Sequence, residues 1–588
     1  MPLTSPRPSA DRSSPLPRGA VEDVVSMLPE WLETVRHLRH QAGFQVAIWH
    51  DGELVTEVAV GAADEPAGIP LTTRHRLRIA SHSKMFTALT IMRLREQGRL
   101  RLDDTVGDHV AELSDSPVAD RTLRDLLSHS AGLTRDSDDS RWWRLATPFA
   151  DRERLLQISR IGAVIAEPGL HLQYSNIGYG LLGLVIEEIT GMTFAEAVTE
   201  LVLGPVGVEE IGPDLPVGAA GPEAADGFAL GHTSLLHGPR RVVEQISTGA
   251  LAAATGFWAT AGGIASVAGR VLTADALLEP RSLREMRRRV WTLHDGGQYG
   301  LGLQEGRLHG FTVIGHSGGF PTGLSRTWAA PAERLVVSVI GTSVDSPSSD
   351  IALGVLGLLA LAAGRPAPQA QEWERAGAQG GASDGRPRPR TLAEQDEERW
   401  DETGEDAGSG AGWRVGPSES AGTGASTDAS KGEGEGASAS AGEGAGAGAG
   451  ADERKGEHAG ESEDLGMLSA ARIAQLVEGT YDSLWGRTRL AALGGRLFSL
   501  DESLTDPASA ALELSVGGVR PDPIEPDLEV VELATWGDTG YGTWAEPILA
   551  RLTVEGDEGS LRCTGLVVTG QVQIPSAEFV MPERILAP

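Results

Sequence analysis

Residues 81–98 read SHSKMFTALTIMRLREQG and place a serine and a lysine three positions apart at the start of a helical pattern. Apolar residues recur at Met85, Leu89 and Met92, and Gly98 supplies a stop, so the pattern predicts a helix that begins near residue 81. Residues three apart share one helical face, which places the Ser81 hydroxyl beside the Lys84 amine. The helix N-terminus adds a positive field that favours an anionic oxygen at Ser81.

Lysine is rare in this chain, and this rarity favours a specific chemical role for Lys84. Of the 50 basic residues only Lys84, Lys431 and Lys455 are lysine, and the last two lie in a low-complexity stretch. A serine needs a neighbouring base to act as a nucleophile, and a desolvated lysine can lose its proton where arginine cannot. The alternative explanation for the single lysine is drift within an arginine-rich composition. The S-x-x-K spacing by itself also arises by chance in long chains.

Tyr174-Ser175-Asn176 precedes a second predicted helix, IGYGLLGLVIEEITG. A phenol can shuttle a proton where nearby cations hold its pKa down, and the Asn176 amide can bond both a lysine and a substrate amide. The alternative interpretation is an ordinary helix start with a serine or asparagine cap.

A third group, His316-Ser317-Gly318-Gly319, follows the predicted strand FTVIG, and a glycine there lets a substrate backbone approach closely. Taken alone, His316 is equally explained as a surface histidine where a strand meets a turn. For the remaining histidines that we weighed and for the tryptophan pair, structural roles are the simpler interpretation; these residues are His82, His129, His171, Trp142 and Trp143.

Taken together, Ser81-x-x-Lys84, Tyr174-x-Asn176 and His316-x-Gly318 resemble, in order and approximate spacing, the signature motifs of serine β-lactamases and penicillin-binding proteins. The segments TLRDLLSHSAGL (122–133) and TGFWATAGGIASVA (255–268) resemble the same family. The resemblance covers about residues 21–365 and is closest to the branch of class C β-lactamases, DD-peptidases, D-aminopeptidases and esterases.

The resemblance implies a fold and a set of roles. The fold would be α/β, an antiparallel sheet flanked by helices plus a helical lobe. Ser81 would form an acyl-enzyme, Lys84 and Tyr174 would share the proton transfers, and Asn176 would orient lysine and substrate. The backbone N–H groups of Ser81 and Gly319 would form the oxyanion hole, beside His316 and Gly318 of the third motif, with no metal or cofactor.

Local patterns agree with such a sheet. FQVAIWHDGELVTEVAVGAAD contains two alternating strands joined by Asp51-Gly52, a strong hairpin signal. GFTVIGHSGG and ERLVVSVIGT form a further predicted strand pair near the end, and IALGVLGLLALAAG (351–364) would be the last helix, packed on the sheet. From residue 466 a short helical start and strand-like runs, the last of them AEFVMP, predict a small antiparallel β-barrel or sandwich.

A chain of 588 residues is too long to fold around a single hydrophobic core, so we expect more than one folded unit. We predict four regions. They are a disordered tail (1–20), a hydrolase-like domain (21–365), a disordered acidic Gly/Ala/Ser-rich linker (366–465) and the β-rich C-terminal domain (466–588).

Composition narrows the possible partners and compartment. The net charge of -32 argues against nucleic acid or an anionic membrane as partner, and the lone Cys563 excludes an internal disulfide. The N-terminus lacks the apolar core of a secretory signal, and the apolar run at 351–364 is too short to span a bilayer, so a cytoplasmic protein is expected.

One departure from the family pattern bears on substrate. β-Lactamases of this branch begin the third motif with lysine, whereas His316 is only partly charged near neutral pH. We therefore expect a peptidase, aminopeptidase-like enzyme or esterase acting on a small molecule or short peptide, rather than a true β-lactamase. A second hypothesis is a binding or sensor protein without turnover. Oligomeric state stays open.

Overall fold

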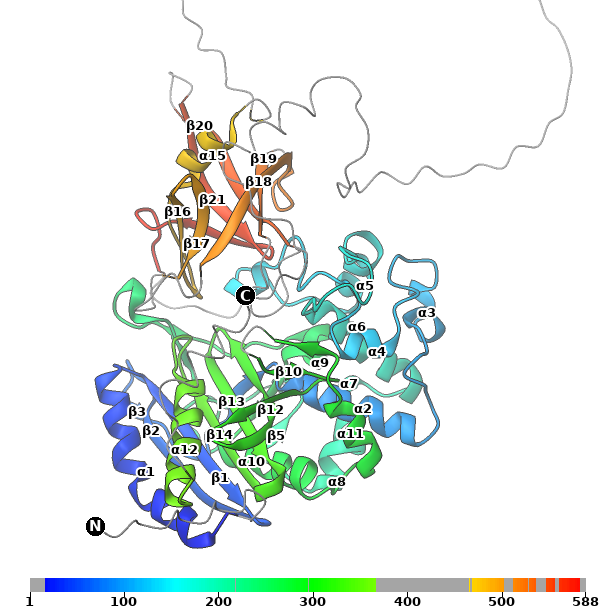
Figure 1. Ribbon diagram of the computed structural model, residues 1–588, viewed down its shortest axis with the longest axis vertical. Helices are drawn as coiled ribbons and strands as arrows, with labels where there is room; N and C mark the ends of the chain where they lie inside the picture. The colour runs from blue at the N-terminus through cyan, green and yellow to red at the C-terminus, as the bar shows by residue number, and fades with distance from the viewer. Residues whose placement is uncertain are drawn as a thin grey trace, which may run out of the picture.

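The computed structural model describes residues 16–216, 218–293, 296–365, 465, 468–501, 511–526, 528–535, 546–555 and 560–581. These residues form two units, an N-terminal unit (16–365) and a β-barrel (468–581), and the barrel stands on one end of the N-terminal unit (Figure 1). Residues 1–15 of the predicted tail and residues 366–464 of the predicted linker lie outside the described part, whereas 18–20 already belong to helix α1.

A nine-stranded antiparallel sheet organises the N-terminal unit, and its first and last long strands pair at its centre. In spatial order the strands are β3 (Ile69–Pro70), β2 (Glu53–Asp64), β1 (Gly43–His50), β14 (Leu335–Gly341), β13 (Gly323–Ala330), β12 (Phe311–Phe320), β11 (Gln304–Leu308), β10 (Gln298–Tyr299) and β9 (Trp291–Thr292). The predicted closure of one sheet by N- and C-terminal segments is confirmed.

The predicted Asp51-Gly52 hairpin is confirmed, and both residues adopt positive φ, 50° and 100°, as a two-residue turn requires. The expected alternation is wrong for β1, because all eight of its residues are buried. The reason is that β1 has helices on both faces, so each side of the strand needs apolar residues.

The third predicted motif was placed wrongly relative to its strand. His316, Gly318 and Gly319 lie within β12, which continues to Phe320, and not in a turn after it. A further strand, β13, separates the two segments that we had paired, so β12 and β14 both neighbour β13 rather than each other. Gly323 and the small residues around it hid this strand from a pattern based on apolar alternation.

Helices cover the two faces of the sheet. α1 (Arg18–Leu38) and α12 (Ser348–Ala362) lie together over one face, where they enclose an apolar core with β1 and β14, and α10 (Ala261–Ala268) covers the other (Figure 1). The prediction of a last helix packed on the sheet is confirmed. A helical lobe with a larger core completes the unit; its helices are α2 (Ser83–Glu96), α3 (Val106–His109), α4 (Leu123–Leu127), α5 (Arg152–Ile161), α6 (Asn176–Thr190), α7 (Phe194–Val198), α8 (Gly204–Val206), α9 (Ala252–Thr255) and α11 (Pro280–Arg287).

Two smaller sheets accompany the lobe. One pairs β4 (Leu77–Ala80), β8 (Phe257–Ala259) and β5 (Ile211–Gly212), and the other pairs β6 (Gly231–His232) with β7 (Val242–Val243). Strand β4 matters most for the site, because it ends one residue before Ser81 and packs against β12.

The C-terminal unit is a closed barrel that begins with a helix, α15 (Ala470–Val477). Its strands are β15 (Gly479–Ser483), β16 (Gly486–Leu493), β17 (Arg496–Leu500), β18 (Leu512–Pro521), β19 (Glu529–Thr535), β20 (Ile548–Glu555), β21 (Ser560–Val568) and β22 (Gln571–Pro575). The predicted small antiparallel barrel is confirmed. The run AEFVMP is not a strand over 577–581; β22 closes the barrel instead, through its pairing with β15.

In the part of the chain that the structure describes, we find no helix with both the length and the apolar character needed to cross a membrane.

Candidate active site

Ser81 lies in the short turn between β4 and α2. Ala80 before it adopts φ 47°, a left-handed conformation that is costly for a residue with a Cβ atom. The helix starts at Ser83, two residues later than predicted, and the Lys84 N–H donates to the Ser81 carbonyl across 3.1 Å. The turn therefore presents the Ser81 side chain at the N-terminal end of α2, where the helix dipole favours negative charge.

Lys84 is completely buried, and its amine has three oxygen neighbours. Nζ lies 2.7 Å from Asn176 Oδ1, 2.9 Å from the Ala254 carbonyl and 3.4 Å from Ser81 Oγ. A neutral amine has two N–H bonds and one lone pair. The asparagine and the carbonyl accept the two N–H bonds, which leaves the lone pair for the Ser81 O–H.

Electrostatics favour this neutral form. Burial holds the pKa of Lys84 well below its usual range, the Arg135 guanidinium lowers it further, and Asp136 acts in the opposite direction. A lysine in this state can accept the proton of a serine hydroxyl near neutral pH.

The second predicted motif stands at the start of α6. Ser175 is the N-cap, and its Oγ accepts the Gly178 N–H at 2.8 Å, so the ordinary capping role is also present. The Tyr174 ring is buried, with Lys84 Nζ 4.5 Å from its centroid. Asn176 bonds Lys84 through its oxygen and donates its Nδ2 to Asp136 Oδ1 at 2.8 Å. The structure thus brings Ser81, Lys84, Tyr174 and Asn176 together.

His129, for which a structural role was the simpler interpretation, fixes the backbone on both sides of Tyr174. Its Nδ1 accepts the Ser175 N–H at 3.0 Å, its carbonyl accepts the Gln173 N–H at 2.8 Å, and its ring lies 4.2 Å from the Tyr174 ring. Burial lowers the pKa of His129 well below its usual value, consistent with a neutral ring that accepts through Nδ1.

Gly318 allows the third motif to reach the first. A Cβ atom on Gly318 would clash with the Ile79 carbonyl, so only glycine lets β12 pack this tightly on β4. The contact joins Gly318 to strand β4, the strand that directly precedes Ser81.

His316 is held as a neutral ring inside the protein. Its Nδ1 donates to the Ser317 carbonyl at 2.6 Å, and its Nε2 accepts the Tyr299 hydroxyl at 3.2 Å. Burial and the neighbouring His82 hold its pKa well below the usual value. Both ring nitrogens therefore have partners within the protein, and burial disfavours a positive charge on the third motif.

The barrel reaches this region at two points. The first is the β15–β16 turn, whose Leu484 and Trp485 join the large apolar core of the N-terminal unit. Trp485 Nε1 donates to the Trp143 carbonyl at 2.9 Å, and its ring lies 5.9 Å from the Trp143 ring, edge on. Trp143 packs in turn against Phe149 and Phe320, so an aromatic cluster stands at the end of β12.

The second point is Glu546 of the barrel. Its carboxylate accepts the Arg135 N–H, the Thr134 hydroxyl at 3.2 Å and the Gln173 amide at 3.2 Å. These donors lie immediately beside Tyr174 and Asp136. Burial raises the pKa of Glu546 to about 7.

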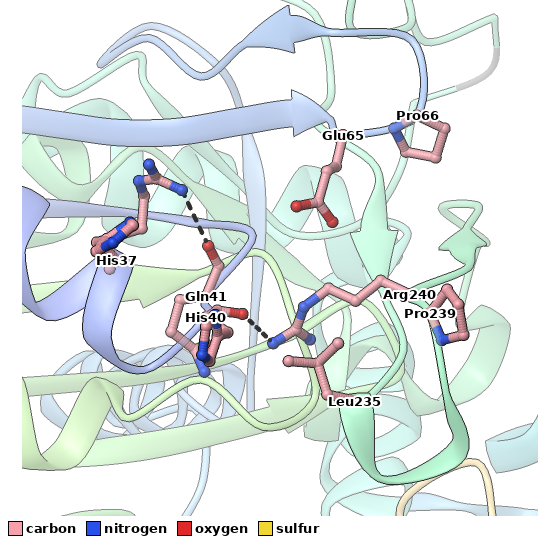
Figure 2. Close-up of a pocket in the computed structure, with 9 residues that line it drawn as sticks. His37, His40, Gln41, Glu65, Pro66, Leu235, Pro239 and Arg240 are labelled. Carbon is pink, nitrogen blue, oxygen red and sulfur yellow. Dashed lines mark hydrogen bonds between the residues drawn. The ribbon is translucent and has the colours of Figure 1, made fainter.

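Figure 2 shows a different pocket, of about 450 Å³, between the end of α1, Glu65 and the loop around Arg240. Its two arginines are occupied: Arg36 pairs with Glu33 and donates to the Gln41 carbonyl, whereas Arg240 pairs with Asp345 and donates to the His40 carbonyl. None of the predicted site residues lines this pocket. Among the described residues, no cluster of three or more His, Cys, Asp or Glu side chains could hold a metal ion.

Sequence reasoning missed Asp136, Arg135, Glu546 and Trp485 as neighbours of the site. Arg135 and Asp136 lie two and three residues after the family-like segment 122–133, and extending that segment would have included them. Neither barrel residue lies in a recognisable motif.

The amino-acid sequence matches a known protein family over most of the N-terminal unit. Residues 31–362, more than half of the chain, match the family model described as Beta-lactamase. The chain therefore belongs to the beta-lactamase family, whose members are typically serine hydrolases.

Individual relatives follow. Protein flp of Staphylococcus aureus strain COL is 28% identical over 177 residues, which cover 28% of this chain and 34% of that protein. Penicillin-binding protein 4 of Amycolatopsis lactamdurans is 29% identical over 186 residues, 31% of this chain and 47% of that protein. The chain thus spans about a third to a half of these curated relatives. The crystal structure of SurE superposes with a TM-score of 0.50 at 22% identity, covering 95% of this chain and 99% of that one, which shows a shared fold across both units.

Proposed function

We propose that this chain is a serine hydrolase that forms an acyl-enzyme on Ser81 and cleaves amide or ester bonds of small molecules or short peptides. The observation that carries the proposal is the burial of the Lys84 amine beside Ser81. Nζ donates to the Asn176 oxygen and to the Ala254 carbonyl, and it lies 3.4 Å from Ser81 Oγ.

In the proposed reaction, the Ser81 oxygen attacks the substrate carbonyl while its proton passes to Lys84. Tyr174, whose ring lies against the Lys84 amine, relays a proton to the leaving group, and water then releases the acyl group. The N–H groups of Ser81 and Gly319 would bind the developing oxyanion, a contribution on the order of 3 kcal/mol per donor.

Within this class we favour a peptidase, aminopeptidase-like enzyme or esterase over a β-lactamase. The supporting observation is His316, because a neutral ring with both nitrogens engaged offers no cation to a β-lactam carboxylate. A penicillin-recognising protein without turnover is the other candidate; the similarity to a penicillin-binding protein supports binding but does not speak for or against turnover.

The test uses wild type, Ser81→Ala and Lys84→Ala with a short-chain nitrophenyl ester, a D-alanyl amide and a fluorescent penicillin, followed by turnover and intact mass. Turnover that both substitutions abolish is the expected result. A stable wild-type adduct without turnover would favour the sensor. Undiminished hydrolysis by the Ser81→Ala protein would remove Ser81 from the mechanism.

A further inference from the structure

The third motif of this chain carries no lysine, and burial disfavours a positive charge on its His316. Proton transfer through Tyr174 and Lys84 nevertheless benefits from positive charge nearby, since a cation disfavours a proton on the lysine and favours an anionic phenol. The question is which group in the structure supplies that charge.

Arg135 has the required position. Its guanidinium carbon lies 5.5 Å from the centroid of the Tyr174 ring, whose centroid is 4.5 Å from Lys84 Nζ. The ring of the proposed proton relay is thus approached by both basic side chains. About a third of the Arg135 side chain is exposed, so its charge does not bear the full cost of burial.

The other titratable groups around Lys84 do not provide a positive charge. Burial disfavours the charged forms of His129 and His316, and it raises the pKa values of the phenols Tyr179 and Tyr299 well above their usual value. Asp136 is an anion in the same loop, and its Oδ2 lies 3.5 Å from Arg135 Nε, so it offsets part of the guanidinium charge. The carboxyl of Glu546 comes from the barrel.

We propose that Arg135 is a positioning residue of the reaction: its guanidinium, which lies beside the same Tyr174 ring that the Lys84 amine approaches, supplies positive charge at this ring and so favours proton transfer through Tyr174 and Lys84. The inference rests on the proposed function of Ser81 and Lys84. On this proposal, the positive charge of the site comes from the segment after α4 and not from strand β12.

Two hydrogen bonds fix the backbone of Arg135. Its N–H donates to Glu546 of the barrel, and its carbonyl accepts the Asn176 N–H at 2.7 Å. The barrel and the start of α6 therefore both hold the Arg135 backbone, which fixes the point from which its side chain extends.

The experiment compares the pH dependence of kcat/KM for a nitrophenyl ester in wild type, Arg135→Gln, Arg135→Lys and the control Arg154→Gln, with Ser81→Ala as blank. Arg154 is a partly exposed arginine of α5 whose side chain donates to Gln157. Loss of the cation raises the pH at which Lys84 becomes neutral, so the acid-side midpoint should move up by about one pH unit in Arg135→Gln. Arg135→Lys should restore most of the shift, and the control should show none.

A second readout needs no substrate: the pH dependence of Ser81 labelling by a fluorophosphonate should shift in the same way. Asp136→Asn should move the midpoint in the opposite direction, to lower pH. An unchanged midpoint in a folded Arg135→Gln protein that still requires Ser81 would overturn the proposal alone. Activity in the Ser81→Ala blank would instead overturn the proposed function.

Discussion

Trp485 of the barrel lies against Gly319 of the N-terminal unit: a Cβ atom on Gly319 would stand 3.7 Å from Cζ3 of the Trp485 ring. Gly319 is the residue whose N–H we assign to the oxyanion hole. A substrate whose carbonyl reaches that N–H would therefore come close to an indole from another unit of the chain. With Trp143 and Phe320 behind it, this side of the site is apolar and aromatic.

The first prediction concerns the aromatic side of the site formed by Trp485, Trp143 and Phe320. Trp485→Ala removes an apolar surface and the bond to the Trp143 carbonyl, so longer acyl chains should lose more than short ones. We expect kcat/KM for a nitrophenyl octanoate to fall about tenfold relative to the acetate. Leu493→Ala, which changes an exposed barrel residue, is the matched control. An equal loss for both esters would indicate that Trp485 does not contact the acyl chain.

The second prediction concerns the Lys84–Asn176 bond. Asn176→Asp would place a carboxylate where the amide oxygen now lies, 2.7 Å from Nζ. A negative charge there raises the pKa of Lys84, so kcat/KM at pH 7 should fall about a hundredfold and recover partly as pH rises. The measurement is a pH–rate profile with an ester substrate. A drop that is the same at every pH would point to a positional effect and not to the lysine charge.

The third prediction follows from Glu546. Because burial raises the pKa of this carboxyl from 4.5 to about 7, the folded protein binds its proton more tightly than the unfolded chain does. The stabilisation is complete below pH 4.5, falls as pH rises toward 7, and stays at its lower level above that. Glu546→Gln keeps an acceptor oxygen and cannot ionise.

Thermal unfolding between pH 4 and 8 tests this pH-dependent stabilisation by Glu546. The stability of wild type relative to Glu546→Gln should decline across that window and then level off. Glu513→Gln, which removes a barrel carboxylate paired with Arg496, should leave the pH dependence in place. A wild-type curve parallel to that of Glu546→Gln would be the contrary result.

The fourth prediction separates the two glycines of the third motif. Gly318→Ala forces a Cβ atom into the Ile79 carbonyl, and backbone cannot yield easily, so we expect a loss of about 2 kcal/mol or more in stability. Gly319→Ala meets its nearest atom, Leu324 Cδ2, at 3.4 Å and should fold normally. Differential scanning fluorimetry of both proteins decides; equal unfolding temperatures would contradict the proposed packing.

The sequence predicted what local pattern can encode. The spacing of Ser81 and Lys84 gave their proximity, and Asp51-Gly52 gave the central hairpin. The start of α2 was misplaced by two residues because the unusual conformation of Ala80 leaves no signal in its composition. Strand β13 was missed for a similar reason, since glycine and small polar residues at its start weaken the alternation.

Long-range contacts could not be predicted in the same way. Glu546 bonds Arg135 across 411 positions, and Trp485 bonds Trp143 across 342. Neither pair follows from composition or period, because the docking of one folded unit on another depends on surfaces that exist only after both have formed. The surroundings of His316 were similarly hidden, because its burial and its contact with the Tyr299 hydroxyl arise only in the folded chain.

The burial of Lys84 also decides how the protein can be handled. It is the only lysine among the described residues, and its side chain is inaccessible, so the folded surface that the structure describes offers arginines but no lysine amine. An activated ester resin or dye therefore cannot reach the Lys84 amine of the folded protein. Modification of Lys84 by such a reagent would itself report that the neighbourhood of Ser81 had opened.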